Sequence, residues 1–196
     1  MEVAIIKYNA GNIYSVMHGL RRIGIEPILT DDKSVIQSAD KVIFPGVGEA
    51  SSTMAYLREH KLDALIKDLK QPVLGICIGL QLMCKHSEEG NTDCLGIFDT
   101  EVKRFQSLQA CDKVPQMGWN TIHSLQTQLF TPEMEKQYVY YVHSFYAACC
   151  SETIAVTDYL QPFSAALHRD NFYATQFHPE KSGPLGESIL RNFINI

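Results

Sequence analysis

The first feature of this sequence that could do chemistry is a cysteine between two glycines. Cys77 stands two residues after Gly75 and two before Gly79, where the apolar stretch Pro72 to Ile76 meets a helical segment, Leu80 to Lys85. Glycines at these positions are typical of a sharp strand-to-helix turn, because side chains there would clash. The N–H groups of the next helix would favour the thiolate and could hold an oxyanion. The pattern predicts a nucleophile; the alternative is a buried, inert core cysteine.

A histidine and a carboxylate follow about a hundred residues later. His178 and Glu180 lie on either side of Pro179 at the end of a predicted strand, Phe172 to Phe177. Residues two apart on extended backbone project to the same side, so we expect both side chains to face Cys77. His178 would then move protons while Glu180 fixes its tautomer. Alone, this pair would be read as a solvated strand end, and the order Cys, His, Glu argues against the α/β-hydrolases.

The first half of the chain alternates short β-branched runs with segments of helical spacing. This alternation predicts an α/β fold with a mostly parallel sheet and helices on both faces. The expected strands are Val3 to Ile6, Pro27 to Leu29, Val42 to Phe44 and Val73 to Ile76. The expected helices are Ile13 to Ile23, Met54 to Leu57 and Leu62 to Leu69.

The second half is richer in strand patterns and ends in a helix. Strands are expected at Glu101 to Phe105, Tyr138 to Tyr146, Thr153 to Thr157, Ala165 to His168 and Phe172 to Phe177. Residues 169–171 have the composition of a hairpin turn, and the closing helix is expected around Leu185 to Phe193. No linker or repeat divides the chain, so residues 1–196 are expected to form a single domain.

Composition narrows the class of protein. Of 196 residues, 17 are Lys or Arg and 22 are Asp or Glu, and no basic stripe is present, so nucleic acid is not an expected partner. The longest strongly apolar run, Val73 to Leu80, is too short for a membrane span, and the first residues do not resemble an export signal. We therefore expect no membrane association, a cytoplasmic location and reduced thiols. The cysteines other than Cys77 lack zinc-site spacing, so no metal is expected.

Three motifs together resemble the class I glutamine amidotransferases over nearly the whole chain. They are the segment from Gly75 to Gln81, the Phe-Pro-Gly-Val-Gly stretch at residues 44–48, and Gln-Phe-His-Pro-Glu at residues 176–180. Residues 8–12, 115–120, 142–146 and 181–182 are most similar to the glutaminase subunits of imidazole glycerol phosphate synthases. The resemblance implies a flavodoxin-like glutamine amidotransferase fold, with an additional antiparallel β portion in the C-terminal half.

The resemblance also implies a reaction that needs no cofactor. Cys77 would attack the side-chain amide of glutamine, His178 would protonate the departing ammonia, and water would hydrolyse the glutamyl thioester. The backbone N–H groups of Val47 and Ile78 would hold the oxyanion. By similarity, the substrate-binding residues are Gly46, Gly48, Gly79, Gln81, Ser144 and Phe145.

The resemblance implies a partner as well, and the lack of a phosphate-binding loop in the sequence points the same way. By resemblance, ammonia would pass to a (β/α)₈-barrel cyclase subunit in a heterodimer, which makes imidazole glycerol phosphate and AICAR in histidine biosynthesis. The expected interface residues are Asn12, Trp119, Asn120 and Lys181. Asn9 and Ala10 depart from the Gly-Met expected in this loop, which affects the details of docking.

Other functions stay open at this point. A paralogous glutaminase could supply ammonia to a different acceptor enzyme, such as a sugar amidotransferase. A cysteine peptidase or hydrolase could use a similar turn, and a noncatalytic binding subunit could keep the fold, although it would have no need of the triad. Trp119 could be a core residue and Lys181 a solvated surface residue.

Overall fold

The fold is built around a twisted central sheet. The computed structural model describes residues 1–8, 13–46, 48–107, 109 and 112–196. In these residues seven strands lie in the order β11-β12-β13-β4-β3-β1-β2. Their bounds are β1 Val3–Ile6, β2 Ile28–Thr30, β3 Lys41–Phe44, β4 Val73–Ile76, β11 Thr153–Asp158, β12 Pro162–Arg169 and β13 Phe172–Thr175. The five strands from β13 to β2 pair in parallel, whereas β12 and β11 join antiparallel at one edge.

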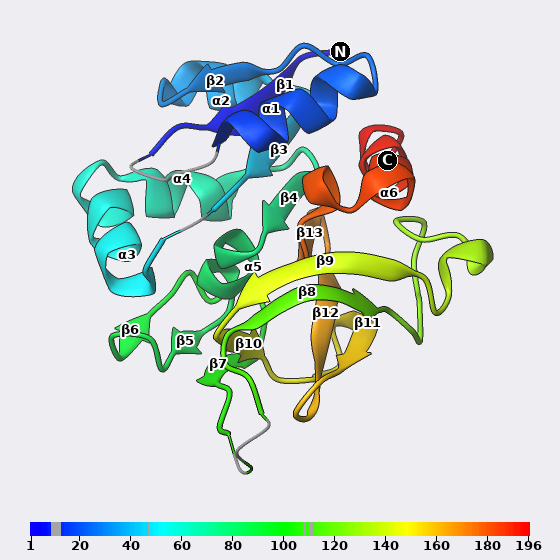
Figure 1. Ribbon diagram of the computed structural model, residues 1–196. Coiled ribbons are helices and arrows are strands. Elements are labelled where there is room, and N and C mark those ends of the chain that lie inside the picture. The colour runs from blue at the N-terminus through cyan, green and yellow to red at the C-terminus, as the bar shows by residue number, and fades with distance from the viewer. Residues whose placement is uncertain (9–12, 47, 108, 110–111) are drawn as a thin grey trace.

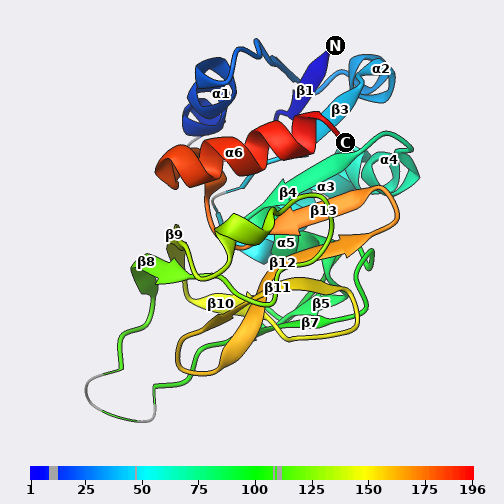
Figure 2. The ribbon, with the colours of Figure 1, turned by 90° about the vertical axis from the view of Figure 1, so that its right-hand side faces the viewer.

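Helices cover both faces of this sheet (Figures 1 and 2). On one face lie α1 (Ile13–Arg22) and α6 (Gly183–Ile194), and on the other lie α2 (Lys33–Ser38), α3 (Ala50–Glu59) and α4 (Leu62–Asp68). The short helix α5 (Ile78–Met83) directly follows β4. This arrangement confirms the predicted α/β class with a mostly parallel sheet.

The alternation of side chains along β1 explains the two layers of core. Val3 and Ile5 pack in the cluster that includes Leu20 of α1 and Leu190 of α6. Ala4 and Ile6 pack in the opposite cluster, with residues of α2, α3 and α4. Because strand residues alternate between faces and both faces are covered, the inner strands are apolar throughout.

The remaining strands form two smaller sheets beside the central one. One contains β5 (His86–Ser87), β6 (Thr92–Asp93), β7 (Glu101–Arg104) and β10 (Phe145–Ala147). The other is an antiparallel ribbon of β8 (Gln116–Thr121) and β9 (Tyr138–His143). Two short 3₁₀ turns, η1 (Pro132–Met134) and η2 (Pro179–Lys181), complete the elements. Among the described helices, none has both the length and the apolar character to cross a membrane.

The structure differs from the sequence-based elements at several points. The strand expected at residues 138–146 is broken at Ser144, because β9 pairs with β8 whereas β10 pairs with β7 in another sheet. The strand expected to reach Phe177 ends at Thr175. Helix α2 and strand β8 were not predicted as elements. The hairpin at residues 169–171 is confirmed by the antiparallel pairing of β12 with β13.

The two helices on one face meet η2 through glycines. A Cβ built on Gly186 of α6 would lie 1.9 Å from the carbonyl oxygen of Pro179, and one on Gly19 of α1 would lie 2.9 Å from Cβ of Glu180. Both distances are shorter than any real contact, so these helices approach the turn only because the side chains are missing.

We predict that Gly186→Ala destabilises the protein. Alanine in a helix interior is ordinarily favoured over glycine by about 1 kcal/mol, but here the methyl group must displace backbone. We expect the free energy of unfolding, measured by urea denaturation, to fall by about 1 to 3 kcal/mol. The control Ser188→Ala, at an exposed position of the same helix, is expected to change it little. A more stable Gly186→Ala variant would contradict this account of the packing.

Candidate active site

Cys77 occupies a strained turn between β4 and α5. Its φ of 55° and ψ of −107° are unusual for a residue with a side chain, and such strain costs about 1 to 3 kcal/mol and is concentrated at functional sites. The turn is held by backbone contacts. The N–H of Cys77 donates to the carbonyl of Thr175 at 2.7 Å, and a Cβ on Gly79 would lie 2.2 Å from the carbonyl oxygen of Phe44. The glycines therefore allow the sharp strand-to-helix turn that the sequence predicts, and Gly79 allows close packing against the backbone of Phe44.

The imidazole of His178 is joined to a buried carboxylate. Its Nδ1–H donates to Oε1 of Glu180 at 2.8 Å, and each side chain is only 2% exposed. The backbone N–H of His178 donates to the carbonyl of Tyr140 at 2.9 Å, and Ser182 Oγ donates to the carbonyl of His178 at 2.7 Å. The pair is therefore held by β9 and by the start of α6.

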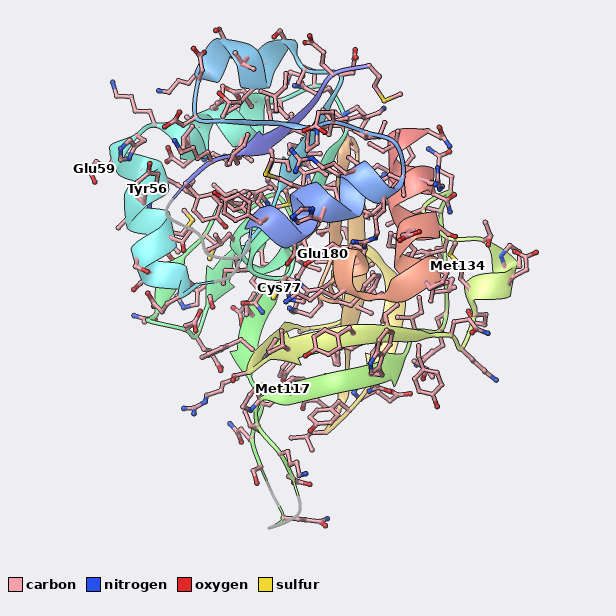
Figure 3. The ribbon with its side chains drawn as sticks, turned by 45° about the horizontal axis from the view of Figure 1, so that its top comes forward. Tyr56, Glu59, Cys77, Met117, Met134 and Glu180 are labelled. Atoms are coloured by element: carbon pink, nitrogen blue, oxygen red, sulfur yellow. The ribbon has the colours of Figure 1, made fainter. Side chains whose placement is uncertain are left out.

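The predicted pairing is thus present, but the geometric reason given for it was wrong. Glu180 does not continue an extended strand; it lies in the 3₁₀ turn η2, with extended backbone only at His178. Pro179 opens that turn, because its fixed φ suits the first helical position. Figure 3 shows Cys77 and Glu180 close to the centre of the molecule.

Two opposing effects set the charge of His178. Burial lowers the pKa of the imidazole, but the charge interaction with Cys77 and the hydrogen-bonded Glu180 carboxylate outweigh burial and raise the pKa above its ordinary value of 6.5. In the described part of the chain, Nε2 of His178 is buried without a hydrogen-bond partner of ordinary geometry. The arrangement favours an imidazolium at neutral pH whose Nε2–H is available to a reacting group.

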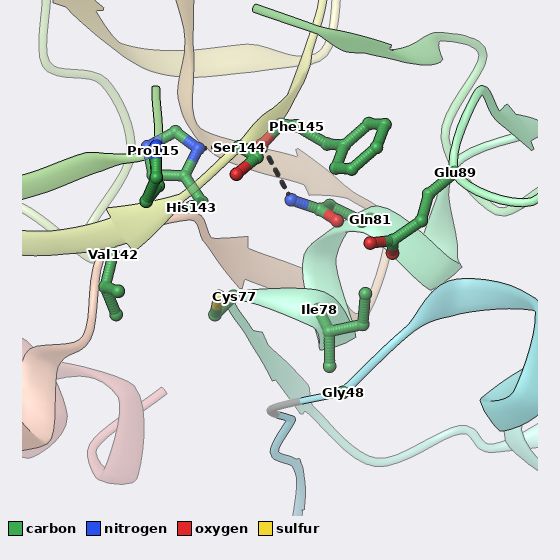
Figure 4. A pocket seen from close by; sticks show the side chains of 10 residues that line it. All are labelled: Gly48, Cys77, Ile78, Gln81, Glu89, Pro115, Val142, His143, Ser144 and Phe145. Atoms are coloured by element: carbon green, nitrogen blue, oxygen red, sulfur yellow. Dashed lines mark hydrogen bonds between the residues drawn. The ribbon is translucent and has the colours of Figure 1, made fainter. Parts of the chain in front are cut away.

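A cavity of about 340 Å³ opens beside the sulfur of Cys77 (Figure 4). Its lining residues are Gly48, Cys77, Ile78, Gln81, Glu89, Pro115, Val142, His143, Ser144 and Phe145. Gln81 Nε2 donates to the carbonyl of Phe145 at 2.8 Å and to Oε1 of Gln176 at 3.0 Å. Both amide hydrogens are then used, so Oε1 of Gln81 is the atom left for a ligand.

Glu89 is a cavity residue that the sequence did not identify. It lies in the turn between β5 and β6, and its Oε2 accepts a hydrogen bond from the N–H of Ala50 at 2.9 Å. Burial is the main cause that raises the pKa of this carboxyl group. In Figure 4 its carboxylate faces the amide of Gln81 across the cavity. No spacing in the sequence ties Glu89 to Cys77; only the folding of this turn against α3 does.

His143 gives the cavity its shape. Burial lowers its pKa to about 4, so the ring is neutral, and its Nδ1–H donates to the carbonyl of Phe145 at 2.7 Å. The same carbonyl accepts from Gln81. The wall formed by residues 143–145 is therefore fixed by hydrogen bonds to its main chain, and its backbone stays available to a ligand.

The structure brings together most, but not all, of the predicted site residues. Gly48, Ile78, Gln81, Ser144 and Phe145 line the cavity with Cys77, whereas Gly79 does not. Gly46 also lies outside the lining; a Cβ there would lie 1.6 Å from Cγ2 of Ile78.

Val47 and Asn12 lie outside the described residues, so the roles predicted for them stay predictions. Within the described ranges, no group of three His, Cys, Asp or Glu side chains converges to hold a metal ion.

Three of the predicted interface residues belong to the described residues: Trp119 and Asn120 lie on β8, and Lys181 ends η2. Trp119 is 55% exposed, and its ring contacts Tyr140 edge-on. Asn120 projects to the opposite side, where its Nδ2 donates to the carbonyl of Asp158 at 2.9 Å. Lys181 is half-buried at the end of η2. Trp119 therefore lies on the exposed side of the ribbon, whereas Asn120 faces the body of the protein.

We predict that Cys77→Ser lowers the pKa of His178, because it removes the thiolate charge that helps to raise it. The titration of the imidazole nitrogens, followed by NMR, should show the imidazolium of the wild type persisting well above pH 6.5 and that of the variant being lost at lower pH. Glu180→Gln should shift the titration in the same direction. Equal His178 titrations in all three proteins would contradict a thiolate–imidazolium pair.

Comparison with known proteins identifies the family and the fold. The family model for class I glutamine amidotransferases matches residues 4–196. Two solved structures share the fold. One is described as a glutamine amidotransferase, with a TM-score of 0.75 at 16% identity, and the match covers 100% of this chain and 98% of the other. The second is PurLQS from Thermotoga maritima, with a TM-score of 0.69 at 16% identity, and here the match covers 99% and 97%.

Curated relatives are more similar in sequence. The imidazole glycerol phosphate synthase subunit HisH of Bacteroides thetaiotaomicron is 62% identical over 196 residues, and that of Yersinia pseudotuberculosis is 40% identical over 198 residues. Both alignments cover 100% of each chain. These matches confirm the resemblance carried by the sequence motifs. The chain belongs to the class I glutamine amidotransferases and, within that family, to the HisH subunits of imidazole glycerol phosphate synthase.

Proposed function

We propose that this chain hydrolyses glutamine to glutamate and ammonia through a thioester on Cys77, with His178 and Glu180 completing the triad. The observation that carries the proposal is the buried His178–Glu180 pair beside a strained cysteine that opens into an amino-acid-sized cavity. A noncatalytic binding subunit would not need a strained nucleophile or a buried proton carrier.

The cavity offers complementary groups for the α-amino acid end of glutamine. Oε1 of Gln81 and the carboxylate of Glu89 are acceptors that face one another, which suits an α-ammonium group. The backbone N–H groups of Ser144 and Phe145 suit the α-carboxylate. We propose that these contacts direct the side-chain amide of glutamine toward the sulfur.

In the first step the thiolate of Cys77 attacks the amide carbon, and the carbonyl oxygen becomes an oxyanion. The N–H of Ile78 lies in the first turn of α5, where backbone donors have no partner within the helix, and it can donate to that oxygen. The N–H of Val47 is the proposed second donor. His178 then gives its Nε2 proton to the departing nitrogen, and ammonia and the thioester result.

In the second step His178 acts in the opposite direction. Its neutral Nε2 accepts a proton from water, and the hydroxide attacks the thioester carbon. The bond to sulfur breaks, Cys77 returns to the thiolate and glutamate leaves. Glu180 holds the ring in one tautomer through both steps, because its carboxylate keeps the proton on Nδ1.

We propose that the ammonia acceptor is held by a (β/α)₈-barrel cyclase subunit, which forms imidazole glycerol phosphate and AICAR in histidine biosynthesis. The curated relatives are named as subunits of imidazole glycerol phosphate synthase, which favours this acceptor over a sugar amidotransferase. We place the heterodimer in the cytoplasm, where the reducing environment keeps thiols such as that of Cys77 from forming disulfides.

The exposed face of the β8–β9 ribbon is the proposed docking surface. The register pairs Met117 with Val142 and Trp119 with Tyr140, so these four side chains project to one side. Met117 and Trp119 are 66% and 55% exposed, and Tyr138, on the same face, is 60% exposed. Val142 also lines the cavity, so a partner on this face would lie beside the site of ammonia release.

We predict that Cys77→Ala separates the two half-reactions. In the complex with the cyclase, glutamine-dependent synthesis of imidazole glycerol phosphate should fall by about 10⁴-fold or more, since no other group can form the thioester. Synthesis from added ammonium salts should stay within about twofold of the wild type, because the partner's site is unchanged. Equal loss of both rates would contradict the proposed division of labour.

Trp119→Ala should weaken association with the cyclase. Large aromatic side chains at the centre of an interface contribute about 2 to 4 kcal/mol, so we expect the dissociation constant, measured by calorimetry, to rise at least about tenfold. Ile28→Ala is the control, because it shortens an exposed apolar side chain on β2, at the far edge of the sheet. If both variants bind as the wild type does, the ribbon is not the docking surface.

A further inference from the structure

A fully buried glutamine outside the triad reaches the sulfur of Cys77. Gln176 directly follows β13, has no exposed surface, and places Nε2 3.7 Å from Sγ of Cys77. Its backbone N–H donates to the carbonyl of Ala165 at 2.8 Å, which fixes where the side chain starts. None of the steps proposed for glutamine hydrolysis uses this side chain.

We infer that Gln176 is a catalytic residue whose amide donates a hydrogen bond to the Cys77 thiolate. The bond keeps the sulfur charged and oriented toward the cavity. This inference rests on the proposed function, in which that thiolate is the nucleophile and later the leaving group.

The hydrogen bonds of Gln81 determine which end of the Gln176 amide faces the sulfur. The carbonyl of Phe145 can only accept, so the atom of Gln81 that lies 2.8 Å from it is the NH₂ group. The same NH₂ group lies 3.0 Å from the amide of Gln176 and requires an acceptor there. Gln176 must therefore turn its oxygen to Gln81 and its NH₂ group to Cys77. The reverse orientation would oppose two NH₂ groups and place an oxygen against the thiolate.

The surroundings make this donor effective. Gln176 is shielded from water, so its NH₂ group has the sulfur as its acceptor, and hydrogen bonds to charged groups are stronger than those between neutral groups. The amide is already oriented, so it needs no rearrangement as charge changes on the sulfur. It would raise the fraction of thiolate before the attack and stabilise the sulfur again when the thioester breaks.

The proposal is tested by the pH dependence of Cys77 alkylation. Iodoacetamide modification of the full chain would be followed at the peptide that contains Cys77, since other cysteines also react. Gln176→Met fills a similar volume without a donor, and we expect the midpoint of alkylation to rise by about one pH unit. Gln176→Glu should raise it further, because the carboxylate still accepts from Gln81 but repels the thiolate.

A matched control variant and a kinetic measurement distinguish a catalytic role of Gln176 from a purely structural role. Gln71→Met removes a glutamine whose Nε2 donates to the carbonyl of Ile36 at 2.8 Å, far from Cys77, and its alkylation midpoint should equal that of the wild type. In the complex, both Gln176 variants should lower kcat for glutamine hydrolysis by about tenfold or more, with a smaller change in KM.

Unchanged alkylation midpoints in both folded Gln176 variants would overturn the inference. Because alkylation does not require glutamine turnover, a wild type that fails to hydrolyse glutamine would refute the proposed function without affecting this test. The glutamate variant is nearly isosteric with glutamine, so it decides the question if the methionine variant fails to fold.

Discussion

The whole site depends on backbone packed against backbone at one turn. Gly79 lies so close to the carbonyl oxygen of Phe44 that no side chain could fit between them, and the N–H of Cys77 is tied to Thr175. These contacts connect the C-terminal ends of the neighbouring parallel strands β3, β4 and β13. They hold Cys77 in a conformation that an isolated chain would avoid, and the free energy for this strain comes from the packed sheet beneath it.

The His178–Glu180 pair is positioned by the same kind of contact. Helices α1 and α6 approach the η2 turn through Gly19 and Gly186, so the segment that carries Glu180 is enclosed from both sides. Because both side chains are buried, water cannot screen the Glu180 carboxylate from the His178 imidazole, and the two groups interact strongly. The cavity adds hydrogen bonds that start at the carbonyl of Phe145 and reach the sulfur through Gln81 and Gln176. The atoms proposed to bind substrate and those proposed to react thus belong to one connected network.

The structural features that could be predicted from the sequence are those that depend on local residue patterns and short spacings. The turn around Cys77, the parallel first half and the helix at the C-terminus all carry glycine or periodicity signals that survive folding. The pairing of His178 with Glu180 was predicted from their separation, although the backbone between them is a 3₁₀ turn rather than a strand.

What could not be predicted depends on contacts between distant segments. Glu89 reaches the cavity only because the hairpin of β5 and β6 folds against α3, and no residue spacing in the sequence indicates this contact. The break at Ser144 arises because the two parts of the expected strand pair in different sheets, β9 with β8 and β10 with β7. The role of Gln176 depends on the orientation of its amide, which follows from the hydrogen bonds of Gln81 to Phe145 and to Gln176, 64 and 95 residues away from Gln81 along the chain.

The most direct test of the account is to look for the covalent intermediate itself. The complex with the proposed cyclase subunit would be mixed with glutamine, quenched in acid within its first turnovers, and digested for mass spectrometry. The account predicts a glutamyl group attached to the peptide that contains Cys77, which disappears on treatment with hydroxylamine. Glutamate released at full rate with no label on that peptide, or with the label on another cysteine, would contradict it.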